Sequence, residues 1–533
     1  MRLLAYAGLL SGLYSATANT IVDLGYAKYQ GNLSFPNTVA YLGLPYAEPP
    51  VGELRWRSPL PLNTTRVSQS AHGAVIDASS NPEFCIQGTT GNGDAGGAGS
   101  EDCLKVNVYA PANAKKGDKL PVLVYIHGGG YVFGNPANWP FDHWIHQEPS
   151  VVIVSVYYRL DSIGFLSHPA FASTPSLGDL NVGFSDQALA LRWVQEHIDA
   201  FGGDPGQVTI NGQSAGGSSV ELHLVASGQE GLFHGAIAQS VYRTPLPSPE
   251  QQEPLFNFYA EKAGCGGLKS VSDTMSCLRQ APISALAPAQ DAAFNGSYNA
   301  FHPVFDGKII PVRPTPSILS GRFAKVPLIV GATSNETLSG GDDISSALKA
   351  FFPGLTQNDL TGFNEVYNAS NFGSSNEQFR VATGESELRC AVEIMGGAFS
   401  QPEQGKTYVY RYNTPNPTGG DPLVEHAAEN WMMFLGTNTG VNGTTMFSPM
   451  TPSEQAFASE LIAYWLSFVR TGNPNTFKLA RAPTWPTYTP STSHRIVLTE
   501  GSATKTGSTL ETISSEERQR CAFVTSKAAS QQA

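Results

Sequence analysis

The sequence predicts an α/β fold in which a large, mostly parallel sheet is covered by helices on both faces. Two observations predict it. Short apolar runs of strand length are nearly continuous rather than alternating with polar residues, as in strands that are buried on both faces. Between these runs lie stretches whose apolar residues recur at helical spacing, and strands that alternate with helices favour a parallel sheet.

The predicted strands are rich in β-branched residues, which pack well on a pleated surface. They cover residues 122–126, 151–157, 208–210 and 326–330. A helix is predicted over residues 185–201, because Leu191, Val194, Ile198 and Phe201 recur at the spacing of one helix face.

The later part of the chain adds a second helix and a region of different composition. The helix is predicted around residues 457–468 and stops at Gly472-Asn473-Pro474. Residues 245–325 are rich in Pro, Ala and Gln, which predicts irregular helices and loops that cap the sheet and select the substrate. Because no charge block or Pro/Ser-rich hinge divides the chain, we expect residues 19–533 to form one domain.

The first 18 residues have the three parts of a secretory signal peptide. Met1 and Arg2 supply a positive start, residues 3–14 are mainly apolar, and Ala16-Thr17-Ala18 has the form of a cleavage site. No other window approaches the length of a membrane-spanning helix, and the C-terminal residues lack the tail of a lipid-anchor signal. We therefore expect a secreted protein without a stable membrane anchor.

Charge and cysteine content limit the partners and the compartment. The chain has 44 acidic and 32 basic residues and no cluster of Lys and Arg that could follow a phosphate backbone, so nucleic acid is not an expected partner. Six cysteines form an even set that should pair in an oxidising compartment. Sequence proximity favours Cys85 with Cys103, Cys265 with Cys277 and Cys390 with Cys521, although six cysteines can be connected in many other ways.

Sequons of the Asn-x-Ser/Thr type mark candidate glycosylation sites, which belong on a secreted surface. The candidates are Asn32, Asn63, Asn295, Asn368 and Asn442. A further sequon is at Asn335, directly before Glu336.

Ser214 is the candidate nucleophile. The predicted strand at 208–210 leads into Gly212-Gln213-Ser214-Ala215-Gly216, which fits the pattern G-x-S-x-G. The pattern needs small residues on both sides of the serine because a strand turns abruptly into a helix there. A helix is predicted over residues 218–225, so the turn would present the serine hydroxyl at the carboxyl end of the sheet.

An upstream glycine run supplies candidate donors for an oxyanion. The predicted strand at 122–126 runs into the sequence HGGGY at 127–131, whose backbone N–H groups can bind the negative oxygen of a tetrahedral intermediate. The expected donors are the N–H groups of Gly129, Gly130 and Ala215. The two motifs in this order, each after a strand, are far more specific than either alone.

These motifs resemble those of the type-B carboxylesterase/lipase family, which includes fungal lipases and cholinesterases. The resemblance rests on SEDCL, HGGGY, the run from Asn181 through FGGDPGQVT to GQSAGG, and VRTGNPN, and it extends from about residue 22 to 523. It implies an α/β-hydrolase fold and a serine ester hydrolase in which Glu usually serves as the acid of the triad. It also implies chemistry that needs no metal and no organic cofactor.

The acid and the base follow from their order in the chain, because in this fold the nucleophile precedes the acid and the acid precedes the histidine. Glu336 follows the predicted strand at 326–330 and resembles the acid of the family. Asp306 is its main rival, although its segment resembles a structural turn, and Asp342 and Asp343 are weaker rivals.

His426 is the candidate base, since DPLVEHAAENWMMFLGT resembles the family's H-G-x-E segment. Ala427 stands where the family usually has Gly, a departure that bears on the local backbone geometry. The other histidines after Ser214 are interpreted as structural or loop residues: His223, His234, His302 and His494. If Glu336 is buried beside His426, then Asn335 is expected to remain unglycosylated.

Two features bear on the substrate, a small-molecule ester. Gln213 stands where the family commonly has Glu, so cationic substrates gain less. Between Cys85 and Cys103 the chain reads IQGTTGNGDAGGAGSED, with neither the apolar lid of lipases nor an aromatic that stacks on choline. We therefore expect soluble or short-to-medium-chain esters as substrates.

Two alternatives stay open. A triacylglycerol lipase would use the same chemistry and build a hydrophobic entrance from residues 245–325. A non-catalytic adhesion protein of this fold would usually lack the nucleophile and carry an anchor, so it is the weaker alternative. Aromatic residues that are candidates for the pocket wall are Tyr131, Phe133, Phe301 and Trp431.

Overall fold

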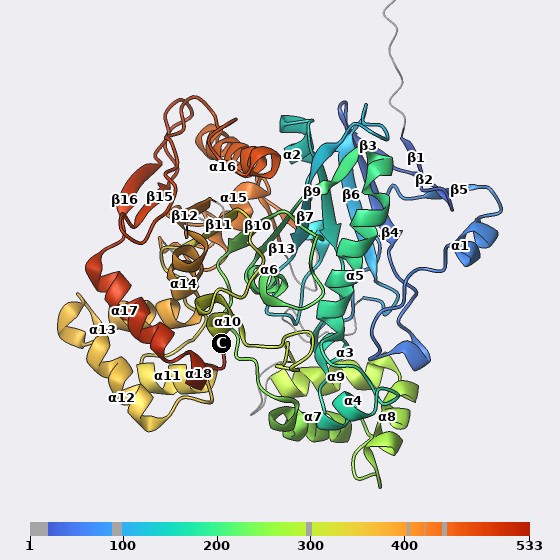
Figure 1. Cartoon of the computed structure of the whole chain (residues 1–533), viewed down its shortest axis with the longest axis horizontal. Helices are drawn as coiled ribbons and strands as arrows, with labels where there is room; N and C mark the ends of the chain where they lie inside the picture. Colours follow the sequence, from blue (N-terminus) through green and yellow to red (C-terminus); the bar gives the residue numbers. More distant parts are fainter. Residues whose placement is uncertain (1–19, 88–98, 295–300, 402–405, 421, 440–444) are drawn as a thin grey trace, which may run out of the picture.

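An 11-stranded sheet forms the centre of the computed structural model, which describes residues 20–87, 99–294, 301–401, 406–420, 422–439 and 445–533. Across the sheet the strands follow the order β16 (Thr509–Thr512), β15 (His494–Leu498), β12 (Thr407–Tyr412), β11 (Leu328–Thr333), β10 (Gly235–Gln239), β9 (Gly203–Gln213), β7 (Leu120–Ile126), β8 (Val152–Val156), β6 (Lys105–Pro111), β4 (Thr38–Pro45) and β3 (Asn32–Phe35) (Figure 1). Neighbours from β15 to β8 are parallel, and antiparallel strands complete both edges. The predicted mostly parallel sheet is confirmed. The expected signal peptide, residues 1–18, lies outside the described residues.

Helices cover both faces of the sheet, as predicted. Alternate residues of a strand point to opposite faces, so Val124 of β7 joins one hydrophobic core cluster and Tyr125 joins another. The first cluster includes α5 (Val182–His197), α6 (Ala215–Val225) and α14 (Cys390–Phe399). The second includes α2 (Asp142–Gln147), α15 (Ala428–Met433) and α16 (Pro452–Thr471).

The predicted elements are present, with shifted ends. The helix predicted from residue 185 begins at Val182 and changes at residues 198–201 into a 3-10 turn. The helix predicted from residue 218 begins already at Ala215, directly after the candidate nucleophile. The short strand predicted at 208–210 is part of β9, which starts earlier because its first residue pairs with β7. The Gly472 stop of α16 has a left-handed backbone, as a helix C-cap requires.

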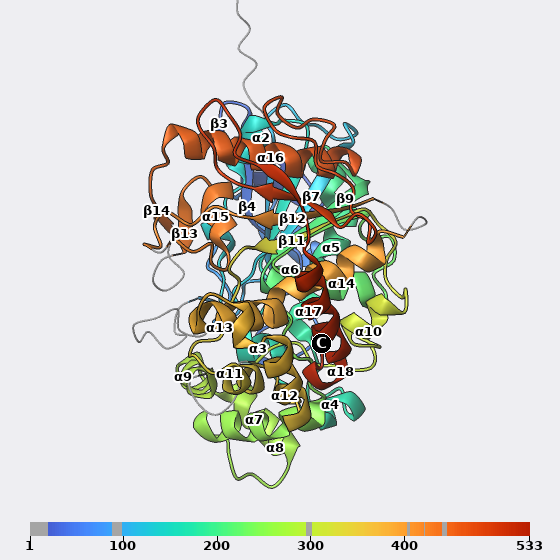
Figure 2. The ribbon, with the colours of Figure 1, turned by 90° about the vertical axis from the view of Figure 1, so that its left-hand side faces the viewer.

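Further helices gather mainly at one end of the molecule, opposite α2 and α16, as both views show (Figures 1 and 2). They are α7 (Pro249–Lys262), α8 (Val271–Gln280), α9 (Ile283–Phe294), α11 (Ile344–Phe351), α12 (Gln357–Val366) and α13 (Ser375–Gly384). A π-helical turn, Glu385–Arg389, joins α13 to α14. The remaining helices are α1 (Thr64–Ala71), α3 (Asp161–Phe165), α4 (Pro169–Ser173), α10 (Pro314–Leu319), α17 (Ser515–Ser526) and α18 (Ala528–Gln531).

Two small sheets complete the strands of the described residues: β1 (Ile21–Asp23), β2 (Lys28–Gln30) and β5 (Val75–Asp77) form one, and β13 (Thr437–Thr439) and β14 (Thr445–Phe447) form the other. None of the described helices combines the length and the apolar character needed to cross a membrane.

Three disulfides link cysteines that are 18, 12 and 131 positions apart in the sequence. They link Cys85 to Cys103, Cys265 to Cys277 and Cys390 to Cys521, the pairing that sequence proximity favours. Of the candidate glycosylation sites, Asn32, Asn63 and Asn368 are exposed, and Asn295 and Asn442 lie outside the described residues. Glycosylation at these sites stays a prediction.

Candidate active site

Ser214 occupies the sharp turn between β9 and α6. Its backbone has φ 60° and ψ −124°, a region that side-chain-bearing residues rarely adopt. The Ser214 N–H donates to the Gln239 carbonyl oxygen at 2.9 Å, which ties the turn to the end of β10. A Cβ on Gly212 would overlap the backbone of Gly216, and one on Gly216 would overlap the Ile126 carbonyl. Small residues are therefore required at both positions, as the motif predicts.

His426 and Glu336 complete a continuous chain of hydrogen bonds from Ser214. The His426 Nε2 atom lies 2.8 Å from Ser214 Oγ, and its Nδ1 atom lies 2.6 Å from Glu336 Oε2. His426 is 212 positions from Ser214 and 90 positions from Glu336 in the sequence, and the ends of β9 and β11 and the loop before α15 bring the three residues together. The residues predicted as nucleophile, acid and base are thus linked by hydrogen bonds in the structure.

The Glu336 carboxylate is fixed by neighbours other than His426. Its side chain is buried, with 1% of the residue exposed. The second oxygen, Oε1, accepts hydrogen bonds from the Thr333 backbone N–H at 2.9 Å and from Ser240 Oγ at 2.5 Å. Thr333 ends β11 and Ser240 follows β10, so two adjacent parallel strands orient the carboxylate.

The rival acids have other roles. Asp306 accepts hydrogen bonds from the backbone N–H groups of Lys308 and Ile310, so it stabilises a local turn. Asp343 caps the N-terminus of α11 by accepting from the Ser346 N–H, and Asp342 is exposed.

The rival histidines also lie apart from Ser214. His223 is buried behind the nucleophile turn, with its ring nitrogens facing the side-chain oxygens of Gln187 and Gln229. His302 is buried with its Nδ1 atom beside the Pro303 carbonyl. His234 and His494 are exposed, and neither lines the cavity of Ser214.

The pKa values of His426 and Glu336 shift in the directions expected for an ion pair. Burial alone lowers the pKa of His426, but the charge and hydrogen bond of Glu336 outweigh it, so the pKa rises above its ordinary 6.5. Burial raises the pKa of Glu336, but the charge of His426 and the hydrogen bonds with His426, Ser240 and Thr333 outweigh it, and the pKa falls below its ordinary value. Glu336 is therefore ionised wherever His426 is active as a base.

Two further carboxyl groups are buried around this pair. Burial raises the pKa of Glu429 to about 7, and the nearby charge of Glu336 acts in the same direction. Burial also raises the pKa of Glu387 to about 7, despite hydrogen bonds to its carboxylate. Both groups contribute to the raised pKa of His426 when they are ionised.

The glycine run at 127–131 packs directly against the nucleophile turn. A Cβ on Gly128 would lie 2.9 Å from the Ser214 Cβ atom, so a side chain there would displace the serine. Gly129 and Gly130 follow with φ of 103° and 61° and line the same cavity as Ser214. Ala215 is the first residue of α6, where helix N–H groups have no acceptor within the helix. The three predicted donors are thus grouped around the serine.

Ser214 and His426 open onto a cavity of about 320 Å³. Its apolar wall is formed by Val132, Phe133, Trp139, Phe294 and Leu338. Its polar wall is formed by Gln213, Tyr242 and Asn430 together with His426. Among the described residues lining the cavity, His426 is the sole ionisable side chain apart from the tyrosine, so the cavity suits a neutral substrate.

The expectations for the pocket are met in part. Phe133 lines the cavity, but Tyr131 packs on Phe165, Phe301 packs on Tyr259, and the Trp431 indole donates to Ser448 Oγ. Phe294 is the one described residue of the segment 245–325 that lines the cavity. Most of the loop between Cys85 and Cys103, residues 88–98, lies outside the described residues.

Sequence reasoning missed several cavity residues. Tyr242 and Leu338 follow the ends of β10 and β11, and this placement near strand ends is a signal that a search restricted to motifs overlooks. Trp139 has no comparable signal in the sequence, because its place in the cavity wall depends on the 3-10 turn, Pro136–Asn138, that directly precedes it.

The Asn335 side chain is occupied by a backbone contact. Its Oδ1 atom accepts from the Val424 N–H at 3.0 Å, and its own N–H donates to the Val424 carbonyl at 3.0 Å. These bonds join the loop of Glu336 to the segment that leads to His426. A glycan would be attached at Nδ2 rather than at Oδ1, so these contacts do not test the sequon, and the absence of a glycan on Asn335 stays a prediction.

Comparison with known proteins gives consistent matches over most of the chain. Residues 18–523 match the model of the carboxylesterase family. The chain is 30% identical to an acylcarnitine hydrolase of Mus musculus over 516 residues, covering 90% of this chain and 87% of that protein. It is 29% identical to a fumonisin B1 esterase of Sphingopyxis macrogoltabida over 450 residues, covering 82% and 79%. The crystal structure of Aspergillus niger EstA superposes with a TM-score of 0.83 at 29% identity, covering 97% of this chain and 99% of that one.

Proposed function

This chain belongs to the carboxylesterase family and is a carboxylic ester hydrolase, and from that premise we propose that it hydrolyses esters through an acyl-enzyme formed on Ser214. The observation that carries the proposal is the hydrogen-bond chain from Ser214 through His426 to Glu336, which opens onto a largely apolar cavity. In the described part of the chain, Ser214 is the one serine whose hydroxyl bonds to an imidazole that in turn bonds to a buried carboxylate.

In the proposed mechanism, Ser214 Oγ attacks the ester carbonyl while His426 Nε2 takes its proton. Glu336 holds the His426 ring in the tautomer that leaves Nε2 free to accept, and it stabilises the imidazolium that forms. The negative oxygen of the tetrahedral intermediate is bound by the N–H groups of Gly129, Gly130 and Ala215. His426 then protonates the leaving alcohol, and water repeats the sequence on the acyl-enzyme.

We propose neutral esters with short-to-medium acyl chains as substrates, rather than long-chain triacylglycerols. A cavity of about 320 Å³ lies at the small end of the range for ligand pockets, which begins at ~300 Å³. Gln213, which replaces the acidic residue common in the family, adds no negative charge beside the scissile bond, so choline-like alcohols gain no attraction there. The names of two relatives, an acylcarnitine hydrolase and a fumonisin B1 esterase, refer to different compounds and do not narrow this choice.

A chain-length series tests both the chemistry and the substrate class. Nitrophenyl esters from acetate to palmitate are offered to the purified wild type and to Ser214→Ala. We expect the highest kcat/KM at short-to-medium chains without activation at an oil–water interface, and a loss of about 10⁶-fold in kcat in the variant. Retained activity in Ser214→Ala would refute the nucleophile. Preference for long chains with interfacial activation would instead favour the lipase alternative.

We also propose that the protein is secreted after removal of residues 1–18. The cleavage pattern at the N-terminus and the three disulfides are typical of an exported chain. N-terminal sequencing of protein from the culture medium should begin near residue 19, and a product retained inside cells with Met1 intact would contradict the proposal.

A further inference from the structure

The loop that carries Glu336 is held by contacts on both sides of that residue, and the contacts after it lie outside the hydrogen-bond chain of Ser214, His426 and Glu336. On the carboxylate side, Ser240 and Thr333 bind Glu336. Beyond Glu336 the chain turns past the cavity, and the N–H groups of Leu338 and Ser339 both donate to Glu387 Oε2, at 2.7 and 3.2 Å. The Ser339 hydroxyl donates to the other oxygen of the same carboxylate.

Glu387 is well placed to act as an anchor for this loop. It is fully buried, and its three hydrogen bonds all go to residues two or three positions after Glu336. Leu338, one of the two residues that it binds, lines the cavity of Ser214. A second contact lies one turn away, where the Thr337 and Thr383 hydroxyls are 2.8 Å apart.

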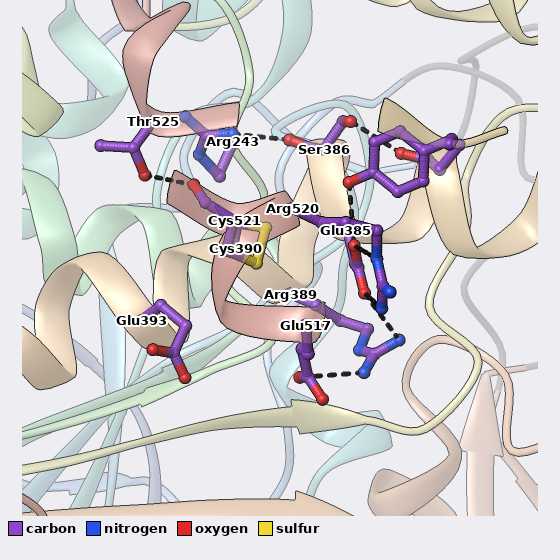
Figure 3. The surroundings of a disulfide bond; sticks show 12 residues. Arg243, Glu385, Ser386, Arg389, Cys390, Glu393, Glu517, Arg520, Cys521 and Thr525 are labelled. Carbon is purple, nitrogen blue, oxygen red and sulfur yellow. Dashed lines mark hydrogen bonds and ion pairs between the residues drawn. A yellow bond between two sulfur atoms is a disulfide. The ribbon is translucent and has the colours of Figure 1, made fainter. Parts of the chain in front are cut away.

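The segment that presents Glu387 is itself fixed. It is the π-helical turn Glu385–Arg389, and such turns inserted between α-helices are frequent at functional sites. Figure 3 shows how its neighbours surround the disulfide between Cys390 and Cys521. Arg520 forms two hydrogen bonds to Glu385, at 2.6 and 2.8 Å, and Arg389 pairs with Glu517 at 3.1 Å.

Arg243 links this turn to the other side of the cavity. Its side chain donates to the Ser386 carbonyl at 2.7 Å (Figure 3). Its backbone N–H donates to the Glu387 carbonyl at 2.9 Å. The preceding residue, Tyr242, lines the cavity. The turn therefore makes direct hydrogen bonds to the backbone beside two cavity residues, Leu338 and Tyr242, that lie on different strand ends.

We propose that Glu387 is a positioning residue, whose carboxylate holds the loop 336–339 so that Glu336 meets His426 and Leu338 forms the cavity wall. The proposal rests on the proposed function of Ser214, His426 and Glu336. It requires the reach of the side chain and two hydrogen-bonding atoms at its end, one that accepts from the two adjacent N–H groups and one that bonds to the Ser339 hydroxyl.

Two substitutions separate reach from charge. Glu387→Asp keeps the charge but shortens the side chain by one methylene, so it cannot reach all three donors. Glu387→Gln loses the charge but keeps the reach, since its oxygen can accept from both N–H groups and its amide can donate to the Ser339 hydroxyl. Glu393→Asp is the matched control, because Glu393 is on α14 and binds Tyr488 rather than the loop.

The measurement is kcat on a short-chain nitrophenyl ester, per folded chain counted by near-UV circular dichroism. We expect Glu387→Asp to lower kcat about 10- to 100-fold, as a displacement of ~1 Å in the acid would, and Glu387→Gln and Glu393→Asp to stay near the wild type. A wild-type kcat in Glu387→Asp, or an equal loss in Glu387→Gln, would overturn the proposal. If Ser214→Ala also retained activity, the proposed function itself would fail, whereas an inactive Ser214→Ala would confine the failure to Glu387.

Discussion

Two residues of the site keep backbone conformations that are unfavourable for their side chains. Ser214 has φ 60° and ψ −124°, and such conformations cost about 1–3 kcal/mol each. Ala427 has φ 64°, at the position where the family usually has Gly. The departure does not alter the local geometry, because Ala427 still adopts the left-handed conformation and α15 begins directly after it. In both cases the surrounding hydrogen bonds hold the strained residue next to the cavity.

The pH dependence of kcat/KM should report the ionisation of His426, which must be neutral to accept the serine proton. Burial lowers the pKa of this imidazole, but the charges of Glu336, Glu429 and Glu387 and the hydrogen bond to Glu336 outweigh that effect, so the pKa lies above 6.5. Activity should therefore fall as the pH drops through a midpoint above 6.5. Of the three carboxyl groups, Glu336 has the largest effect on the pKa of His426, so in Glu336→Gln the midpoint should move to lower pH. Because the carboxylate that orients the imidazole is lost, kcat should also drop by about 10⁴-fold.

The profile is measured as kcat/KM between pH 5 and 9 on an ester whose own hydrolysis is slow. A midpoint at or below 6.5 in the wild type, or one that Glu336→Gln leaves unchanged, would contradict the assigned partner of His426.

Among single residues, Ser214 is the one that the sequence predicts most directly, because its motif fixes the backbone around it. Ser214 follows from its strand, its glycines and its turn, and the chain order then limits the choice of Glu336 and His426. The anchor Glu387 has no such pattern, because its partners are the N–H groups of Leu338 and Ser339, about fifty positions away. Only the fold brings them together.

Among the elements, the junction of α13 with the π-helical turn bears most directly on the acid. Gly384 ends α13, and a Cβ there would overlap the carbonyl oxygen of Glu336. Glycine is therefore needed so that the helix can approach the loop. Gly397, within α14, offers a matched control because a Cβ there would meet nothing within 4 Å.

Substituting these glycines by alanine should have opposite effects on the free energy of unfolding. Gly384→Ala forces the helix and the Glu336 loop apart and should destabilise the protein by about 1–3 kcal/mol, with a loss of kcat. Gly397→Ala should stabilise it by about 0.5–1 kcal/mol with unchanged kcat, because alanine restricts the unfolded helix segment. Denaturant unfolding followed by circular dichroism tests both, and equal effects of the two substitutions would contradict the close approach at Gly384.

Elements were predictable where periodicity is strong and local. The core strands and the helices α5 and α16 follow from their apolar patterns, with ends shifted by a few residues. The π-helical turn was not predictable, since the letters ESELR resemble an ordinary helix. Its extra residue per turn is stabilised by tertiary partners, the pairs with Arg520, Glu517 and Arg243, which no local pattern reveals.

For the whole molecule, the order of strands explains how site residues that are far apart in the sequence come together. The sheet places β9, β10 and β11 side by side and parallel, so their carboxyl ends, which carry Ser214, Ser240 and Glu336, share one edge.

The fold class and the family predicted from sequence are confirmed. The cap was predicted less well, because from residues 245–325 only Phe294 among the described residues reaches the cavity, whereas Leu338 comes from outside that segment. Residues 88–98 and 295–300 lie outside the described residues, so any contribution of theirs to the cavity stays a prediction.

The central claim is that one serine, Ser214, is the nucleophile of this ester hydrolase, and covalent trapping tests it most directly. The purified wild type and Ser214→Ala are incubated with a phosphonylating ester analogue, and the intact mass and the modified peptide are then determined. The account predicts one adduct per chain, located on Ser214, with activity lost in proportion to labelling and with no labelling of the variant. An adduct on another residue, or full esterase activity in a chain labelled at Ser214, would contradict it.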